Sequence, residues 1–167
     1  MRIVVTGTPG SGKTILAKAL GEKLDYKVIN EKDFALKNSL GIFNEENELE
    51  IPIKKFQSKA NAFLKKNDDV IIEGHVVCEM KLNVDKVILI RVHPEVLESR
   101  LEQRNYAPQK MMDNVFCEGI EYCKKQAVKN YSKKAIIEIE SRPSFKQTLS
   151  EALNALKTAK NPKTRTF

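Results

Sequence analysis

The 167-residue sequence has no apolar run long enough to cross a lipid bilayer, and its N-terminus lacks the pattern of a secretory signal. Cysteine is scarce. Cys78, Cys117 and Cys123 are odd in number and form no C-x-x-C pair, which argues against a zinc site or a disulfide and favours buried free thiols. We therefore expect a cytoplasmic protein in a reducing compartment, with no membrane partner.

Lysine, by contrast, is abundant. The formal net charge is +7 and the sequence pI about 9.2, with most of the charge scattered as on a solvated surface. Two basic concentrations, at residues 124–134 and 157–167, could contact rRNA or an acidic partner, although solvated disorder explains the tail equally well. The hydrophobic content of 41% fits a single domain, which we place at residues 1–160 with a basic tail at 161–167.

Five β-rich runs alternate with helical patterns along the chain. The runs cover residues 2–6, 26–30, 69–73, 86–92 and 135–140. Several are almost continuously apolar, which is typical of strands buried on both faces of a parallel sheet. Helical patterns follow the first strand and begin again at Pro52 and Pro94. We predict an α/β fold with a five-stranded parallel sheet and helices on both faces.

A complete G-x-x-x-x-G-K-[ST] motif at residues 7–14 follows the first strand and opens a helix. Its glycines let backbone N–H groups turn toward a polyphosphate, and the helix N-terminus adds partial positive charge. Lys13 should reach the outer phosphates, and Thr14 should offer a hydroxyl to Mg²⁺. We therefore predict that the fold is of the P-loop NTPase class and that ATP and Mg²⁺ bind here. The nucleotide contacts assigned to this segment are Gly7, Pro9, Gly10, Ser11, Gly12, Lys13, Thr14 and Ile15.

Ligands of such folds lie outside the carboxyl ends of the strands, so residues just past each strand are candidates for the site. The third strand runs into Glu73-Gly74-His75. Glu73 could hold Mg²⁺ directly or through water, or else cap a nearby helix. His75 could order a nucleophilic water or steer a phosphate, or else be a buried structural histidine.

Three of the six arginines fall between residues 91 and 104. Arg91 follows the fourth strand, while Arg100 and Arg104 lie one helical turn apart. Guanidinium groups clamp transferring phosphoryl oxygens in a way that lysine cannot match. A break at Pro108 suggests a short lid at about residues 104–113. The alternative for Arg100 is pairing with glutamates of its own helix.

Residues 31–52 form an insertion between the second strand and the next long helix. In a phosphate-loop kinase such an insertion normally builds the acceptor site, for which Asp33 and Lys37 are the candidates. Asp33 fits a helix N-cap equally well.

Taken together, these motifs resemble the atypical adenylate kinases that double as small-ribosomal-subunit assembly ATPases. This family is known as adenylate kinase isoenzyme six or nuclear adenylate kinase, and it has archaeal relatives. The matching pieces are the phosphate loop, the acid-x-His element ending at His75, Arg91, and the run from Arg100 through Asn105-Tyr106 to Cys117-Glu118. The last run and the acid-x-His element are the specific part.

The resemblance implies an adenylate-kinase-like fold with a short lid, phosphoryl transfer between ATP and AMP, ATP hydrolysis, and binding to a ribosomal protein of the small-subunit platform. The residues assigned to catalysis are Lys13, Glu73, His75 and Arg104. Arg100 and Arg104 are also assigned to nucleotide binding, and Asp33, Lys37 and Arg91 are assigned to the binding of the acceptor substrate. Thr14 and Glu73 are assigned to metal binding. Two positions depart from the family pattern: Glu73 replaces an aspartate, and Leu36-Lys37 stands where an arginine is common.

Three functions remain open on this basis. The first is a nucleoside monophosphate kinase with ATPase activity. The second is an assembly ATPase that binds and releases a ribosomal protein with little kinase activity. The third is a small-metabolite kinase of the same architecture. A monomer is expected in each case.

Overall fold

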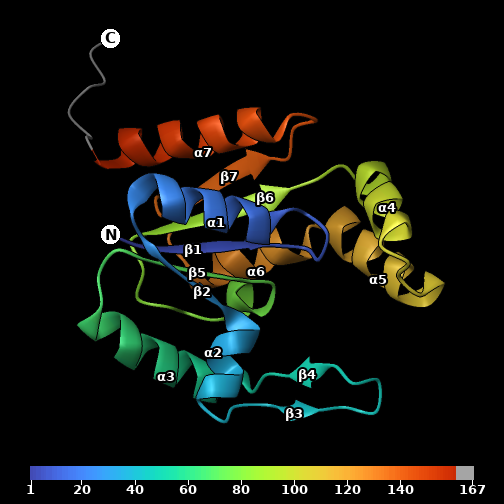
Figure 1. Ribbon diagram of the computed structural model, residues 1–167, viewed down its shortest axis with the longest axis horizontal. Helices are drawn as coiled ribbons and strands as arrows, with labels where there is room; N and C mark the ends of the chain where they lie inside the picture. The colour runs from blue at the N-terminus through green and yellow to red at the C-terminus, as the bar shows by residue number, and fades with distance from the viewer. Residues whose placement is uncertain (161–167) are drawn as a thin grey trace.

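The computed structural model describes residues 1–160, so the basic tail at 161–167 lies outside the described part of the chain. At its centre is a parallel five-stranded sheet with strand order β2-β5-β1-β6-β7 (Figure 1). The strands are β1 (Arg2–Gly7), β2 (Lys27–Asn30), β5 (Val70–Gly74), β6 (Lys86–Arg91) and β7 (Ile136–Glu140). The predicted fold class is confirmed, and each expected strand is present with its ends shifted by one residue at most.

The register of β1 with its neighbours brings the ends of the central strands together. Thr6 pairs with Gly74 of β5, and Gly7 pairs with Ile90 of β6. Side chains alternate along β1, so that Ile3 and Val5 enter the core on one side of the sheet and Val4 the core on the other. The phosphate loop therefore begins directly beside the segment that follows β5.

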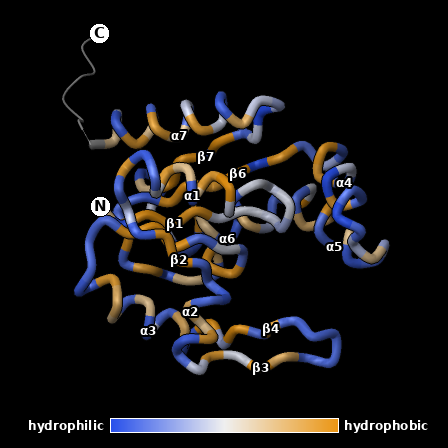
Figure 2. Tube along the Cα trace, in the orientation of Figure 1, coloured by the Kyte–Doolittle hydropathy of each residue, from blue (hydrophilic) through white to orange (hydrophobic). Residues whose placement is uncertain are grey.

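Helices cover both faces of the sheet. The first face carries α1 (Lys13–Leu24) and α7 (Phe145–Lys160); the second carries α2 (Glu31–Lys37), α3 (Ile53–Lys66), the 3₁₀ helix η1 (Val76–Glu79) and α6 (Tyr122–Asn130). Leu16 and Leu20 of α1 pack into the first core, and Phe56 and Leu64 of α3 pack into the second. Figure 2 shows the apolar residues concentrated along the strands between these layers.

Two arms extend past the carboxyl ends of the strands on the same side of the molecule (Figure 1). One is an antiparallel hairpin of β3 (Ile42–Phe43) and β4 (Leu49–Glu50), which the sequence patterns do not predict. The other is the helix pair α4 (Pro94–Gln103) and α5 (Pro108–Gly119). The segment expected to form a lid, at about residues 104–113, is mostly helical. Residues 104–107 are non-helical, whereas Pro108 begins α5. An ion pair between Lys110 and Glu48 joins the two arms.

All three cysteines are free thiols; Cys78 and Cys123 are buried and Cys117 is partly buried. Within residues 1–160, none of the helices is both long enough and apolar enough to span a membrane.

Candidate active site

The phosphate loop joins β1 to α1 at the carboxyl edge of the sheet (Figure 1). Gly10 and Gly12 have φ angles of 89° and 95°, which L side chains rarely adopt. Gly10 also lies against α4, since a Cβ at this position would come within 2.8 Å of side-chain atoms of both Leu97 and Leu101. The loop thus has the strand-to-helix setting that its motif predicts, and α4 packs directly upon it.

Lys13, the first residue of α1, lies near two buried carboxylates. Burial lowers the pKa of the Lys13 ammonium, while the negative charges of Glu31 and Glu73 act to raise it. These acidic groups therefore help to keep a positive charge at the site that a triphosphate would occupy.

Thr14 and Glu73, the two predicted metal ligands, lie together. The Thr14 hydroxyl donates to Oε2 of Glu73 at 3.2 Å, and Nδ2 of Asn30 donates to Oε1 of Glu73 at 2.5 Å. A carboxylate and a hydroxyl form a donor set of the kind Mg²⁺ prefers. Mg²⁺ usually takes one or two protein carboxylates and binds substrate phosphates as well. Within residues 1–160, no group of three His, Cys, Asp or Glu side chains is placed to hold a metal.

His75 lies directly behind the phosphate loop. Its Nδ1 is 3.2 Å from the carbonyl oxygen of Gly7 and 3.5 Å from Sγ of Cys123. Burial acts to lower the pKa of His75, but the hydrogen bond and charge of Cys123 outweigh it, and the pKa is raised overall. Because Nδ1 carries both contacts, Nε2 is the ring nitrogen left to meet a ligand.

Glu31 is a site residue that the sequence analysis missed. Its carboxylate is buried and accepts hydrogen bonds from the backbone N–H groups of His75 and Val76 at 2.9 Å. A Cβ on Gly74 would come within 2.0 Å of this carboxylate, so a glycine is needed there. Glu31 follows β2 directly, and the rule that identified Glu73 and His75 at the end of β5 would have found it.

Arg100, which is predicted to bind nucleotide, lies beside the phosphate loop. Its guanidinium donates to the carbonyl oxygens of Gly10 at 3.5 Å and Ser11 at 3.4 Å, and to Oγ of Ser141 at 3.0 Å, instead of pairing with glutamates of α4. Burial, followed by the neighbouring charge of Arg104, lowers the pKa of Arg100. Two close guanidinium groups beside the loop favour an anionic ligand, which would relieve their repulsion.

A cavity of about 620 Å³ opens beside these arginines. The phosphate loop and Ile15 line one part, Arg100 and Arg104 another, and the segment from Ser141 to Phe145 a third. An apolar slot with a few convergent charged groups is the usual form of a nucleotide pocket. The Ser141–Phe145 segment follows β7, and sequence reasoning overlooked it although it applied the same rule to the other strands.

The predicted acceptor residues lie elsewhere. Asp33 and Lys37 line a cavity of about 290 Å³ against edge strand β2, together with Lys59 and Phe63 and with no phosphate-loop residue. Their assignment to the site of the acceptor substrate stays a prediction, and their position outside the phosphate-loop cavity argues against it. Lys32, which was not predicted, is the basic residue of α2 whose charge acts on Lys13 and on Glu48 of the hairpin arm.

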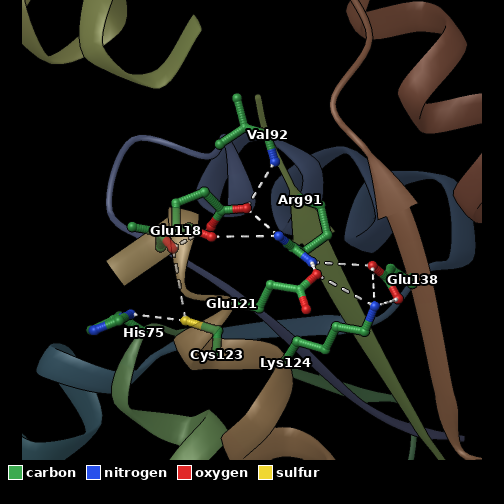
Figure 3. A network of polar contacts seen from close by, with 9 residues as sticks. His75, Arg91, Val92, Glu118, Glu121, Cys123, Lys124 and Glu138 are labelled. Carbon is green, nitrogen blue, oxygen red and sulfur yellow. Dashed lines mark hydrogen bonds and ion pairs between the residues drawn. The ribbon is translucent and has the colours of Figure 1, made fainter. Parts of the chain in front are cut away.

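Arg91 is held by acidic side chains. Its guanidinium bonds Glu118 at 2.7 Å, Glu121 at 2.8 Å and Glu138 at 3.3 Å (Figure 3). Although burial acts to lower the pKa of Arg91, its hydrogen bonds to Glu121 and Glu118 raise it above the ordinary arginine value. An acceptor phosphate would have to displace these carboxylates, so the role first assigned to Arg91 is also disfavoured.

Solved structures that share this architecture include small-molecule kinases. A gluconokinase from Sinorhizobium meliloti superposes with a TM-score of 0.65 at 14% identity, covering 99% of this chain and 97% of its own. A shikimate kinase from Bacteroides thetaiotaomicron gives a TM-score of 0.59 at 17% identity, covering 96% and 98%. The protein therefore has the fold of the P-loop kinases.

Proteins of similar sequence identify the family within this fold class. A family model described as "AAA domain" matches residues 3–121. A protein of Thermococcus kodakarensis is 33% identical over 94% of this chain and 86% of its own length, and one of Methanocaldococcus jannaschii is 35% identical over 74% and 70%. Both carry the name "Putative adenylate kinase". The chain belongs to this archaeal adenylate kinase family.

Proposed function

We propose that the protein transfers the γ-phosphoryl group of ATP to AMP, forming two ADP. The bond between the γ-phosphorus and the β,γ-bridging oxygen breaks, and a new bond forms to an oxygen of the AMP phosphate. One observation carries the proposal: the phosphate loop, Arg100 and Arg104 line one cavity of about 620 Å³, and the ends of β2 and β5 bring Glu31, Glu73 and His75 to the same loop. A further cavity of about 450 Å³ lies at the base of the hairpin, where residues of β3, β4 and the start of α3 line it without any residue of the phosphate loop.

The roles of the residues follow from their positions. Lys13 would neutralise charge on the outer phosphates, and Arg100 and Arg104 would bind ATP and the transferring group from the lid side. Thr14 and Glu73 would hold Mg²⁺, which when bound offsets charge between the phosphates. Lys32 replaces Lys37 as the proposed acceptor cation, because its charge acts on the Lys13 site.

The direct test is the stoichiometry of ADP production by the purified chain. With ATP and AMP, a kinase forms two ADP for each ATP consumed and releases no phosphate. With ATP alone, only hydrolysis remains, giving one ADP and one phosphate. A metabolite kinase would leave AMP unchanged, which would overturn the proposal.

We predict that acceptor affinity depends on the Lys32 face of α2. Lys32→Ala should raise the KM for AMP about tenfold, in line with the 1.5 to 3 kcal/mol that a charged hydrogen bond contributes. Leu36→Arg, one turn further along an exposed face of α2, should lower this KM by adding a forked cation. Lys37→Ala is the matched control and should leave the KM unchanged. If Lys37→Ala instead has the larger effect, the original assignment holds.

A second function is favoured by apolar residues exposed on the two arms. Ile42 is 78% exposed on the hairpin, and Met112 and Phe116 are 62% and 65% exposed on α5. Such side chains suit a protein partner. We propose, as the alternative, that ATP hydrolysis releases the chain from a ribosomal protein of the small-subunit platform, with rRNA contacts through the basic surface.

His75 separates the two functions experimentally. Its free ring nitrogen could orient a water for hydrolysis, whereas AMP brings a nucleophile that its own site aligns. His75→Ala should therefore reduce AMP-independent hydrolysis about tenfold or more and AMP-dependent ADP formation less. Phosphate release and ADP formation measured on one preparation provide the comparison. Equal losses would make His75 part of the shared phosphate site, and no loss would make it structural.

A further inference from the structure

Glu118 of α5 connects the lid arm to the phosphate loop. The carboxylate is only 2% exposed, and each of its oxygens is engaged. Oε2 accepts the hydroxyl of Thr8, inside the phosphate loop, at 2.5 Å. Oε1 accepts from Nε of Arg91 at 2.7 Å and from the backbone N–H of Val92 at 3.2 Å (Figure 3). One side chain thus links α5, the end of β6 and the loop.

The contacts continue behind the loop as far as His75. Oγ1 of Thr8 lies 3.9 Å from Sγ of Cys123, which lies 3.5 Å from Nδ1 of His75. His75 in turn contacts the carbonyl oxygen of Gly7, the residue before Thr8. A buried polar chain therefore runs from Arg91 through Glu118 and Thr8 to His75 and returns to the loop backbone.

The Thr8 side chain has few alternatives to this contact. Thr8 is fully buried, so its hydroxyl would lose a hydrogen bond without Glu118 and could not regain it from bulk water. The charge of Glu118 likewise needs its partners, because a buried carboxylate is costly when unpaired. The pair therefore fixes the loop backbone between Gly7 and Gly10, and the N–H groups of this loop are the donors that would face a phosphate.

We propose that Glu118 is a positioning residue for phosphoryl transfer, and that it acts through Thr8 by holding the phosphate loop in register with the lid helix. The inference rests on the proposed kinase function and adds to it a residue that touches neither nucleotide nor metal. Displacing a reacting group by about 1 Å can cost on the order of 10²-fold in rate, so such a residue can affect turnover from a distance.

Glu121 supplies a matched control, because it also bonds Arg91 but is about half exposed and has no contact with Thr8. Glu118→Gln is expected to lower kcat for ADP formation about 30-fold and to change the KM for ATP less than about threefold. Glu121→Gln should change both by less than about threefold. Thermal unfolding of both variants reports stability separately. A purely structural role for Glu118 would lower the unfolding temperature and leave kcat of the folded enzyme unchanged, which would overturn the proposal.

Thr8 provides a second route if Glu118→Gln does not fold. Thr8→Val removes the hydroxyl and should lower kcat, whereas Thr8→Ser keeps it and should restore most of the activity. The double variant Thr8→Val/Glu118→Gln should be no slower than Glu118→Gln alone, because both act through one contact. Multiplying losses, or equal rates for the Val and Ser variants, would contradict the inference. A parent enzyme that hydrolyses ATP but ignores AMP would refute the proposed kinase instead, and the same variants would then be compared by hydrolysis rate.

Discussion

Replacing Lys13 with alanine is expected to lower both AMP-dependent ADP formation and ATP hydrolysis by about 10³-fold, at the upper end of the loss seen when one transition-state donor is removed. The ammonium lies at the start of α1, close to the charges of Glu31 and Glu73, where negative charge would develop between the outer phosphates. Removing it takes away the positive charge that these two carboxylates help to keep at this site. Initial rates at saturating ATP, with and without AMP, measure the loss.

Lys18→Ala is the control for this experiment, because Lys18 lies on the exposed side of the same helix. It should retain the activity of the parent in both reactions. If Lys13→Ala stays within tenfold of the parent, the phosphate loop is not the working site and the proposed function fails with it.

A linked ligand of two adenosines joined through five phosphates is expected to bind about 10²-fold or more tightly than ATP, because the second nucleotide contact becomes intramolecular. The expectation depends on an acceptor site that lies close enough to the cavity of about 620 Å³ for one ligand to span both. Both adenosines must be accommodated at once for the gain to appear. Isothermal titration of the ligand and of ATP under identical Mg²⁺ conditions gives the comparison.

Saturating AMP should compete with the linked ligand but not with ATP, which would show that the linked ligand occupies an acceptor site in addition to the ATP site. Lys32→Ala should reduce the advantage of the linked ligand and leave ATP affinity unchanged. Binding no tighter than that of ATP would remove the kinase and leave the assembly ATPase as the better proposal.

Much of the site could be predicted because it obeys one local rule: functional residues follow the carboxyl ends of parallel strands. That rule identified Glu73 and His75 after β5, and the structure brings both to the phosphate loop. Applied to β2 and β7, it would also have identified Glu31 and the Ser141–Phe145 segment. Both Glu31 and the Ser141–Phe145 segment were therefore predictable from their positions in the sequence.

Other features could not be predicted because they depend on which face an element presents. Lys32 and Lys37 are both lysines of one short helix, and only the packing of α2 decides that Lys37 lines an outer cavity while the charge of Lys32 acts on the pKa of Lys13. The hairpin strands β3 and β4 are two residues each, too short to leave a periodic pattern.

The sequence by itself determined the parallel sheet, its helical layers and the phosphate loop, because these follow from local periodicity and from a motif whose residues are adjacent in the chain. Only the tertiary structure decided that Arg91 bonds carboxylates instead of facing a substrate, and that Glu118 meets Thr8 across 110 residues of sequence. Contacts between distant segments depend on how the layers pack, and a short side chain such as Thr8 carries no sign of its partner until α5 is placed against the loop.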